Sequence, residues 1–219
     1  MTPELSPDNT ALIVVDMSLD FLQVGAPFET VEGRDMLPAL IRFIQHCREV
    51  KLPIVYLNHV HYPGANDKGT LADRFPVIRD GKAVRAGTEG VTIWPEIAPR
   101  PGDILIEKIR QSGFMYTRLD ATLKELKVLN ILMAGVSTGA CVESTARDAV
   151  SRDYFVYMLS DVTATSGIPD YGWGEMDSAT LQRVFLTNFA YHLGKVASTE
   201  ELMAGPLATK QYRTSSIPD

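Results

Sequence analysis

The sequence predicts an α/β fold with three α-β-α layers, in which a mostly parallel central sheet carries helices on both faces. Two observations support this prediction: short runs of branched apolar residues recur along the chain, and segments with helical spacing of apolar residues lie between them. The chain has 219 residues, of which 45% are hydrophobic. This size and composition favour a single domain over residues 1–219.

The predicted strands are short, strongly apolar and rich in branched residues, as buried parallel strands are. They cover residues 11–15, 54–60, 103–106, 130–136 and 154–159. The predicted helices cover residues 34–51, 117–127, 141–152 and 175–193. Residues 62–101 are instead dense in Pro, Gly and charge. A loop of this length in a compact domain usually covers a site or builds a subunit contact, and a flexible insertion is the alternative.

The charge balance argues against polyanionic partners. A formal net charge of −6 gives no electrostatic reason to expect binding to nucleic acid or to an anionic membrane surface, so a small molecule is the expected partner. The first ten residues are polar, and no stretch approaches the length of a membrane-spanning helix. We therefore expect a cytoplasmic protein.

Reactive side chains follow three of the predicted strands. The first strand runs into Asp16, the third into Lys108, and the fourth into a turn that reaches Cys141 at the start of a helix. Ligands of open parallel sheets bind beyond the carboxyl ends of the strands, so these three residues would face one crevice if their strands are neighbours.

The three residue types suit nucleophilic catalysis. A cysteine attacks as the thiolate, which a helix N-terminus and a cation such as Lys108 stabilise, and Asp16 could accept the thiol proton and return it to a leaving amine. The backbone amides of Ser137, Ala140 and Cys141 are candidates for an oxyanion site.

Each residue also has a simpler interpretation. Asp16 could cap a helix, Lys108 could be a solvated lysine, and Cys141 could be an inert buried thiol, as Cys47 is expected to be within an apolar helical stripe. All three simple explanations would have to hold together, which favours the functional interpretation.

Three segments carry a resemblance to a known family: VVDMSLDF, PGDILIEKIRQSGFMYTRLDATLKEL and ILMAGVSTGACVESTARDAV. They resemble the isochorismatase-like cysteine hydrolase superfamily from residue 11 to about residue 198. The resemblance implies that Asp16, Lys108 and Cys141 form the catalytic set, and that the Val136–Ser137 peptide bond is cis. It also implies a homo-oligomer, either a dimer or a tetramer.

Within that superfamily, SGFMYTRLD and CVESTARDA look most like enzymes that act on ureido or carbamoyl groups, such as N-carbamoylsarcosine amidase, ureidoacrylate amidohydrolase and biuret hydrolase. The resemblance implies that an amide C–N bond is cleaved through a thioester, with release of ammonia. The zinc ligand pattern of the nicotinamidase branch is absent, and His59 and His61, which alternate along a strand end, are expected to face different sides. We therefore expect no metal and no cofactor.

The family positions further suggest a set of substrate-binding residues: Phe21, Asn58, His59, Tyr171, Trp173 and Asn188. Phe21 could instead belong to the core, and Trp173 could be a subunit contact. A substrate with a carboxylate would need a cationic pocket residue, for which Arg110 is the nearby candidate.

Three rival functions remain. A vinyl ether hydrolase of the isochorismatase type would keep the fold, but the presence of Cys141 argues against it. A dinucleotide-binding domain would need spaced glycines after the first strand, where DMSLDF stands instead. A catalytically inactive oligomeric scaffold would not need Asp16, Lys108 and Cys141 together.

Overall fold

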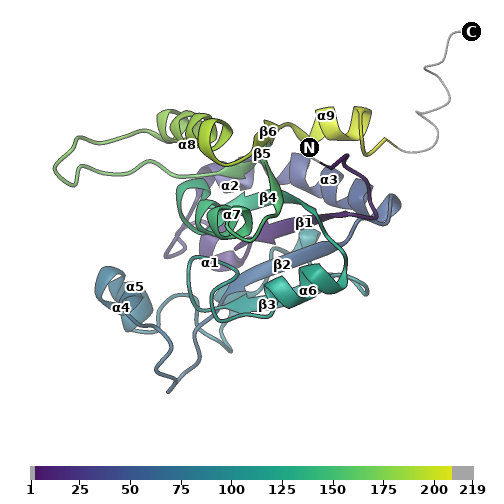
Figure 1. The fold of residues 1–219 in the computed structure, drawn as a ribbon. Helices are drawn as coiled ribbons and strands as arrows, with labels where there is room; N and C mark the ends of the chain where they lie inside the picture. The colour runs from purple at the N-terminus through teal and green to yellow at the C-terminus, as the bar shows by residue number, and fades with distance from the viewer. Residues whose placement is uncertain (1–2, 209–219) are drawn as a thin grey trace, which may run out of the picture.

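In the computed structural model, which describes residues 3–208, a central sheet is covered by helices on both faces (Figure 1). Its six strands are all parallel, in the order β3-β2-β1-β4-β5-β6. The predicted α/β class and three-layer arrangement are confirmed. The strands are β1 Thr10–Val15, β2 Ile54–His59, β3 Ile104–Lys108, β4 Asn130–Val136, β5 Phe155–Ala164 and β6 Lys195–Ala197.

The core forms two apolar layers because both faces of the sheet are covered. Leu12 and Val14 of β1 pack toward α3, whereas Ala11 and Ile13 on the other face pack toward α6 and α7. Every residue of β1 is buried, as expected for a central parallel strand. The helices are α1 Leu19–Leu22, α2 Val31–Asp35, α3 Leu37–Glu49, α4 Leu71–Arg74, α5 Pro76–Arg79, α6 Leu119–Glu125, α7 Glu143–Val150, α8 Ser178–His192 and α9 Thr199–Ala204.

Several predicted bounds are corrected by the structure. The helix predicted at 34–51 is divided at Met36 into α2 and α3, because Pro38 lacks an N–H to donate and stands in the first turn of α3. The third strand extends to Lys108, and the fifth continues to Ala164. The short edge strand β6 and the helix α9 were not predicted.

The long segment at 62–101 is partly ordered. It contains α4, α5 and two short 3-10 turns, η1 Glu89–Val91 and η2 Pro95–Ile97. A further excursion follows β5: residues 167–176, here called the arm, project from the body of the molecule before α8 (Figure 1). An antiparallel bridge between Ile168 and Met176 joins the two sides of the arm at its base.

Among the described residues, no helix combines the length and the apolar character needed to span a lipid bilayer.

Candidate active site

The carboxyl ends of four neighbouring strands bring together the side chains that the sequence singled out. Asp16 follows β1, Lys108 ends β3, and Cys141 lies in η3 Thr138–Val142, a π-helical turn that follows β4. His59 ends β2, which lies between β1 and β3, and is paired in register with Lys108. The parallel sheet therefore gathers four residues that are far apart along the chain.

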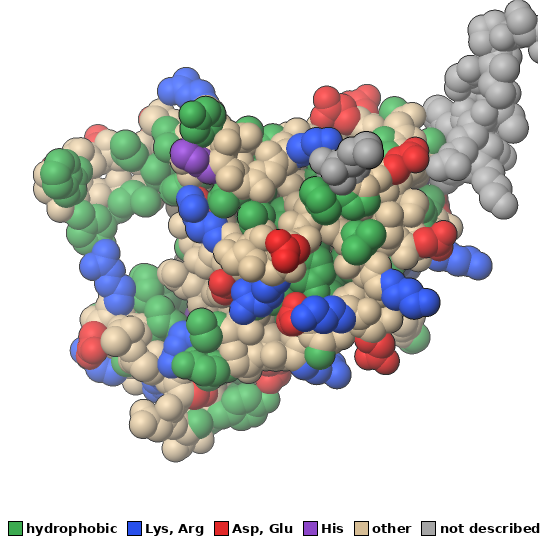
Figure 2. Space-filling view, viewed as in Figure 1, with side chains coloured by type: hydrophobic (Ala, Val, Ile, Leu, Met, Phe, Trp, Pro, Cys, Tyr) green, Lys and Arg blue, Asp and Glu red, His purple; other side chains and the backbone are tan. Residues whose placement is uncertain are grey.

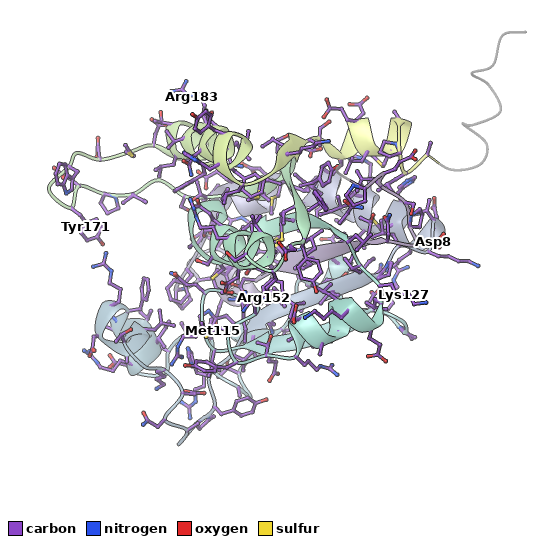
Figure 3. The ribbon with its side chains drawn as sticks, viewed as in Figure 1. Asp8, Met115, Lys127, Arg152, Tyr171 and Arg183 are labelled. Carbon is purple, nitrogen blue, oxygen red and sulfur yellow. The ribbon has the colours of Figure 1, made fainter. Side chains whose placement is uncertain are left out.

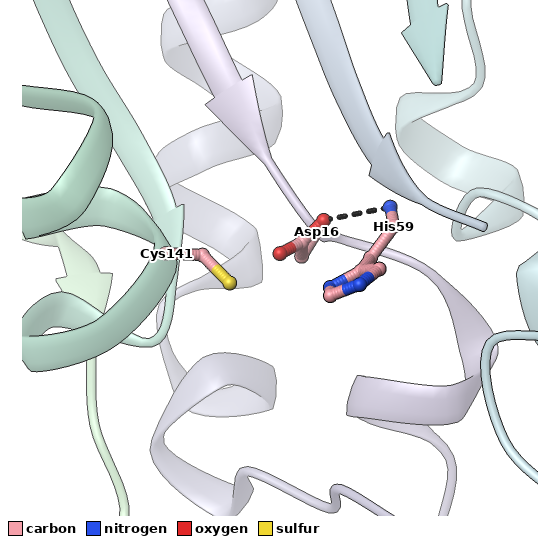
Figure 4. A group of neighbouring side chains, drawn as sticks. All are labelled: Asp16, His59 and Cys141. Atoms are coloured by element: carbon pink, nitrogen blue, oxygen red, sulfur yellow. Dashed lines mark hydrogen bonds between the residues drawn. The ribbon is translucent and has the colours of Figure 1, made fainter. Parts of the chain in front are cut away.

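Asp16 is held on two sides. Its Oδ1 accepts a hydrogen bond of 2.9 Å from the backbone N–H of His59 (Figure 4), and its Oδ2 lies 2.8 Å from the Lys108 ammonium. Both side chains of this ion pair are fully buried. Asp16 has a φ of 52°, in the left-handed region that few residue types other than Gly, Asn and Asp adopt. The backbone turn therefore directs the carboxylate back across the ends of the strands.

Lys108 is a charged group without access to water. Besides Asp16, its Nζ donates to the carbonyl of Arg110 at 3.1 Å and lies 3.5 Å from Nδ1 of His59. Burial alone would lower the pKa of Lys108, but the neighbouring Asp16 carboxylate and Cys141 raise it overall. Lys108 is therefore an ammonium group at neutral pH.

Cys141 faces this pair. Its Sγ lies within 4.8 Å of possible ligand atoms of Asp16 and His59, and all three residues are buried (Figure 4). Burial and the Asp16 carboxylate raise the pKa of the Cys141 thiol to about 12, against the opposing effect of Lys108. The resting form is therefore the thiol, and its proton must leave as the sulfur reacts.

The turn that carries Cys141 is fixed by its neighbours. The Val136–Ser137 peptide bond is cis, as the family resemblance implied. The Thr145 hydroxyl of α7 donates to the Cys141 carbonyl at 2.7 Å, and the Thr138 hydroxyl donates to the Gln182 side chain of α8 at 2.7 Å. Both helices that flank the turn therefore hold it in place.

A cavity of about 310 Å³ opens onto the nucleophile. The segments that follow or end the strands contribute Cys141, Ser137, Ala140, His59 and Gln111 to its lining. The remaining lining residues come from α1, from the loop that follows it, from α4, α5 and the residue between them, and from the position just before the arm: Phe21, Pro27, Phe28, Glu29, Thr30, Leu71, Phe75, Ile78 and Ser166.

The structure brings only some of the predicted substrate-binding residues to this cavity. Phe21 and His59 line it. Asn58 does not, because adjacent residues of a strand point to opposite faces; its side chain donates to the carbonyl of Val91 at 2.8 Å instead. Asn188 lies on α8 and lines a different surface hollow.

Tyr171 and Trp173 lie on the arm and are 72% and 95% exposed. They do not line the cavity that contains Cys141. The space-filling view shows an opening framed by the arm and the α4–α5 region (Figure 2), across which the Arg74 guanidinium lies 5.7 Å from the Tyr171 ring. Figure 3 shows Tyr171 on the outer part of the arm, pointing away from α8.

The expectation that His59 and His61 face different sides is wrong. Residues two apart in a strand share a face, and the Nε2 atoms of the two rings lie 3.1 Å apart. Nδ1 of His61 lies 3.1 Å from Asp67. Burial lowers the pKa of both rings, and nearby Lys108 lowers that of His59 further, so His59 is neutral at pH 7.

Within residues 3–208, Asp16, His59 and Cys141 form the one group of potential metal ligands whose donor atoms converge. A cation at this point would lie beside the Lys108 ammonium, which already occupies Asp16 at 2.8 Å. Like charges at this distance repel strongly in a buried site. The absence of a metal and of a cofactor therefore stays a prediction.

The structure also adds residues that sequence reasoning missed. Phe28, Leu71, Phe75 and Ile78 form much of the cavity wall. Leu71, Phe75 and Ile78 lie in the polar, glycine-rich segment at 62–101. The one sequence signal that could have pointed to them is that they are large apolar side chains in a segment with no periodic pattern.

The chain is similar to known proteins over most of its length. The family model described as the isochorismatase domain matches residues 10–201. Ureidoacrylate amidohydrolase RutB of Rhizobium rhizogenes is 28% identical, over 91% of this chain and 84% of the relative. The same enzyme of Agrobacterium fabrum is 30% identical, over 76% of this chain and 80% of the relative.

Among solved structures, a cysteine hydrolase from Pseudomonas syringae pv. phaseolicola superposes with a TM-score of 0.90 at 31% identity, over 94% of this chain and 95% of that one. N-carbamoylsarcosine amidase from Thermoplasma acidophilum superposes with a TM-score of 0.71 at 26% identity, over 88% of this chain and 98% of that one.

Proposed function

This chain belongs to the isochorismatase domain family of hydrolases, and on that basis we propose that it is a cysteine-dependent amidohydrolase that cleaves a ureido, carbamoyl or other small amide C–N bond. One observation carries the proposal: Cys141 opens onto a cavity and lies next to a fully buried Asp16–Lys108 ion pair. A nucleophile, a proton acceptor and a fixed positive charge are the parts that acyl transfer needs.

In the first half of the proposed reaction, Sγ of Cys141 attacks the substrate carbonyl while Asp16 takes the thiol proton. The raised pKa of the thiol supports this coupling, because little thiolate would exist beforehand at neutral pH. The backbone amides of Ser137 and Cys141 would stabilise the oxyanion of the tetrahedral intermediate. Asp16 then gives its proton to the departing nitrogen, so that ammonia leaves and a thioester remains.

In the second half, a water molecule gives a proton to Asp16 and adds to the thioester carbonyl. The C–S bond breaks, the thiol recovers its proton from Asp16, and the acid product leaves. With a urea, this product is a carbamate, which decomposes to an amine and carbon dioxide. Lys108 stays an ammonium throughout and offsets the negative charge that moves between Cys141 and the substrate, in keeping with its raised pKa.

The names of the relatives support the reaction class. Ureidoacrylate amidohydrolase and N-carbamoylsarcosine amidase are both named for cleavage at a carbamoyl or ureido nitrogen. Identities near 28% support this general chemistry for the chain more strongly than they support any one substrate.

Replacement of the nucleophile tests the proposal. Cys141→Ala and Cys141→Ser should abolish ammonia release from small ureas and amides while the unfolding transition remains cooperative. A mass spectrum of the wild-type protein, quenched during turnover, should show an acyl adduct on Cys141. Cys47→Ala is the matched control, because Cys47 is buried in the other core layer and should retain turnover.

Retained turnover by Cys141→Ala would overturn the mechanism. Turnover of a vinyl ether substrate by that variant would instead support the isochorismatase-type alternative.

A further inference from the structure

We propose that this site selects neutral amides or ureas whose other substituent is an apolar group of about the size of an aromatic ring, and that it rejects substrates with a carboxylate. This inference rests on the proposed function, because it assigns the substrate class of the same cavity. Two features of the cavity wall support it: a cluster of phenylalanine rings and the lack of an available cation.

The apolar wall is continuous. The rings of Phe21 and Phe28 stack with centroids 5.4 Å apart, and Phe75 meets Phe28 edge to face at 5.7 Å. Leu71 and Ile78, from α4 and α5, complete this part of the lining. A substrate ring placed against these three rings would bury apolar surface and gain the same stacked or edge contacts that the phenylalanines make with one another.

The lining offers no positive charge to an anion. Among the described residues that line the cavity, Glu29 alone carries a formal charge, and that charge is negative. Its carboxylate is already engaged by the Arg34 guanidinium at 2.6 Å and by the backbone N–H of Gly25 at 2.7 Å. His59 is neutral because burial and Lys108 lower its pKa.

Lys108 and Arg110 are paired elsewhere, and neither these two residues nor Arg74 lines the cavity. Lys108 is fully buried and paired with Asp16 at 2.8 Å. The sequence had suggested Arg110 as a partner for a substrate carboxylate, but its Nη1 donates to the carbonyls of Asp67 at 2.5 Å and Ile109 at 2.6 Å, and it does not line the cavity. Arg74, on α4, lies over Tyr171 of the arm.

A carboxylate that entered this cavity would lose its hydration without gaining a charged partner. Burial of an unpaired charge is strongly unfavourable, whereas burial of a ring is favourable. The same cavity wall therefore favours ureas with an apolar ring and disfavours ureas with a carboxylate.

A series of three ureas on one ring separates charge from size. The probes are N-benzylurea, 4-(ureidomethyl)benzamide and 4-(ureidomethyl)benzoate; the amide is similar in size to the carboxylate but uncharged. We expect the kcat/KM for ammonia release to fall at least ~10-fold from the benzamide to the benzoate, because charge burial without a partner opposes binding. In a separate comparison, the kcat/KM of N-methylurea, which has no ring, should be ~10-fold lower than that of N-benzylurea. This is the usual effect of losing most of a buried ring.

Two variants test the ring cluster. Phe28→Ala and Phe75→Ala should each lower the ratio of kcat/KM for N-benzylurea over N-methylurea by roughly 10-fold, whereas Phe155→Ala should leave this ratio unchanged. Phe155 is the matched control because it lies at the far end of β5 and is partly exposed. Phe28→Arg should reverse the order of the benzamide and the benzoate.

Calorimetric titration of the same three ureas into the Cys141→Ala variant keeps this test separate from the proposed reaction. Weaker binding of the benzoate than of the benzamide would support the inference even if none of the ureas were hydrolysed. Equal or tighter binding of the benzoate would overturn it, even if ammonia release depended on Cys141 as proposed.

Discussion

The buried ion pair between Asp16 and Lys108 is the residue-scale feature on which the site depends. Neither side chain has contact with water, and they lie 2.8 Å apart. In such surroundings each charge depends on the other, because the loss of either would leave the remaining charge buried without a partner. The pair therefore couples the chemistry of the site to the stability of the protein.

Lys108→Met should lower the free energy of unfolding by about 3–5 kcal/mol, because it leaves the Asp16 carboxylate buried without its counter-charge. Ammonia release should be lost as well. Denaturant unfolding followed by circular dichroism measures the first effect.

The double variant Asp16→Asn/Lys108→Met is the control. It removes both charges, and asparagine tolerates the left-handed φ of 52° at residue 16. We expect it to recover part of the lost stability but none of the activity. If the loss of stability in the double variant equals the sum of the losses in Asp16→Asn and Lys108→Met measured singly, the two charges do not interact.

The Cys141 thiol should make the fold sensitive to alkali. Its pKa is about 12 in the folded chain and would return to the ordinary value of 9.0 on unfolding. Above pH 9 the unfolded chain loses a proton that the folded chain keeps, so stability falls as the pH rises, by up to about 1.4 kcal/mol per pH unit from this group.

We expect Cys141→Ala to lose less stability than the wild type between pH 9 and pH 11, as measured by urea unfolding at a series of pH values. Cys47 is unchanged in both proteins, so its own raised pKa does not enter the difference. Parallel stability curves would contradict the raised pKa of Cys141.

At the scale of elements, close contact between β1 and β4 positions Asp16 beside Cys141. Gly135 of β4 has a φ of 109°, and a Cβ at this position would lie 2.1 Å from the carbonyl oxygen of Val15. The two strands that carry the nucleophile and the carboxylate can approach this closely because residue 135 has no side chain.

Gly135→Ala should therefore destabilise the fold by more than about 3 kcal/mol or prevent expression of folded protein, because both the φ and the contact are unfavourable. Gly102→Ala is a matched control: Gly102 has a φ of 101° but no atom within 4 Å of its hypothetical Cβ. The difference in thermal midpoint between the two variants measures the contribution of the strand contact. Equal midpoints would show that backbone strain alone matters at residue 135.

The elements that the sequence could predict are those with strong local patterns. The buried strands are nearly continuous runs of apolar residues, so they and the convergence of Asp16, Lys108 and Cys141 were predictable. Strand β6 is three residues long and half-buried, and it pairs only with β5, so it has little pattern of its own.

The pocket residues were harder to predict because they depend on direction and on long-range packing. Asn58 and His59 were both expected in the pocket, although neighbouring residues of a strand point to opposite faces. Phe75 and Ile78 reach the cavity through α4 and α5, two four-residue helices whose place in the fold no local pattern indicates.

At the scale of the whole molecule, the arm and α8 expose large apolar side chains that a monomer would leave in water. Trp173 is 95% exposed at the arm, and Tyr191 of α8 is 84% exposed. Together with the homo-oligomer that the family resemblance implied, this exposure leads us to expect that the arm contacts a second copy of the chain.

Trp173→Ser should shift the assembly toward the monomer in sedimentation velocity, because it removes the largest exposed apolar group of that surface. Tyr62→Ser provides the control, since Tyr62 is exposed to 50% on another part of the chain. An unchanged sedimentation coefficient for Trp173→Ser, or a monomeric wild type, would contradict the expectation.

The cavity is lined by two parts of the chain that contribute differently to the fold. Cys141 lies in the turn after core strand β4, whereas Leu71, Phe75 and Ile78 belong to the excursion at 62–101, and of these three Ile78 alone is buried. Changes at Leu71 and Phe75, which are only partly buried, should therefore cost less folding stability than changes in the strands, whereas Ile78 belongs to the buried core. A directed library restricted to positions 71 and 75 could therefore change which substituent the enzyme prefers while leaving Cys141 and the Asp16–Lys108 pair untouched.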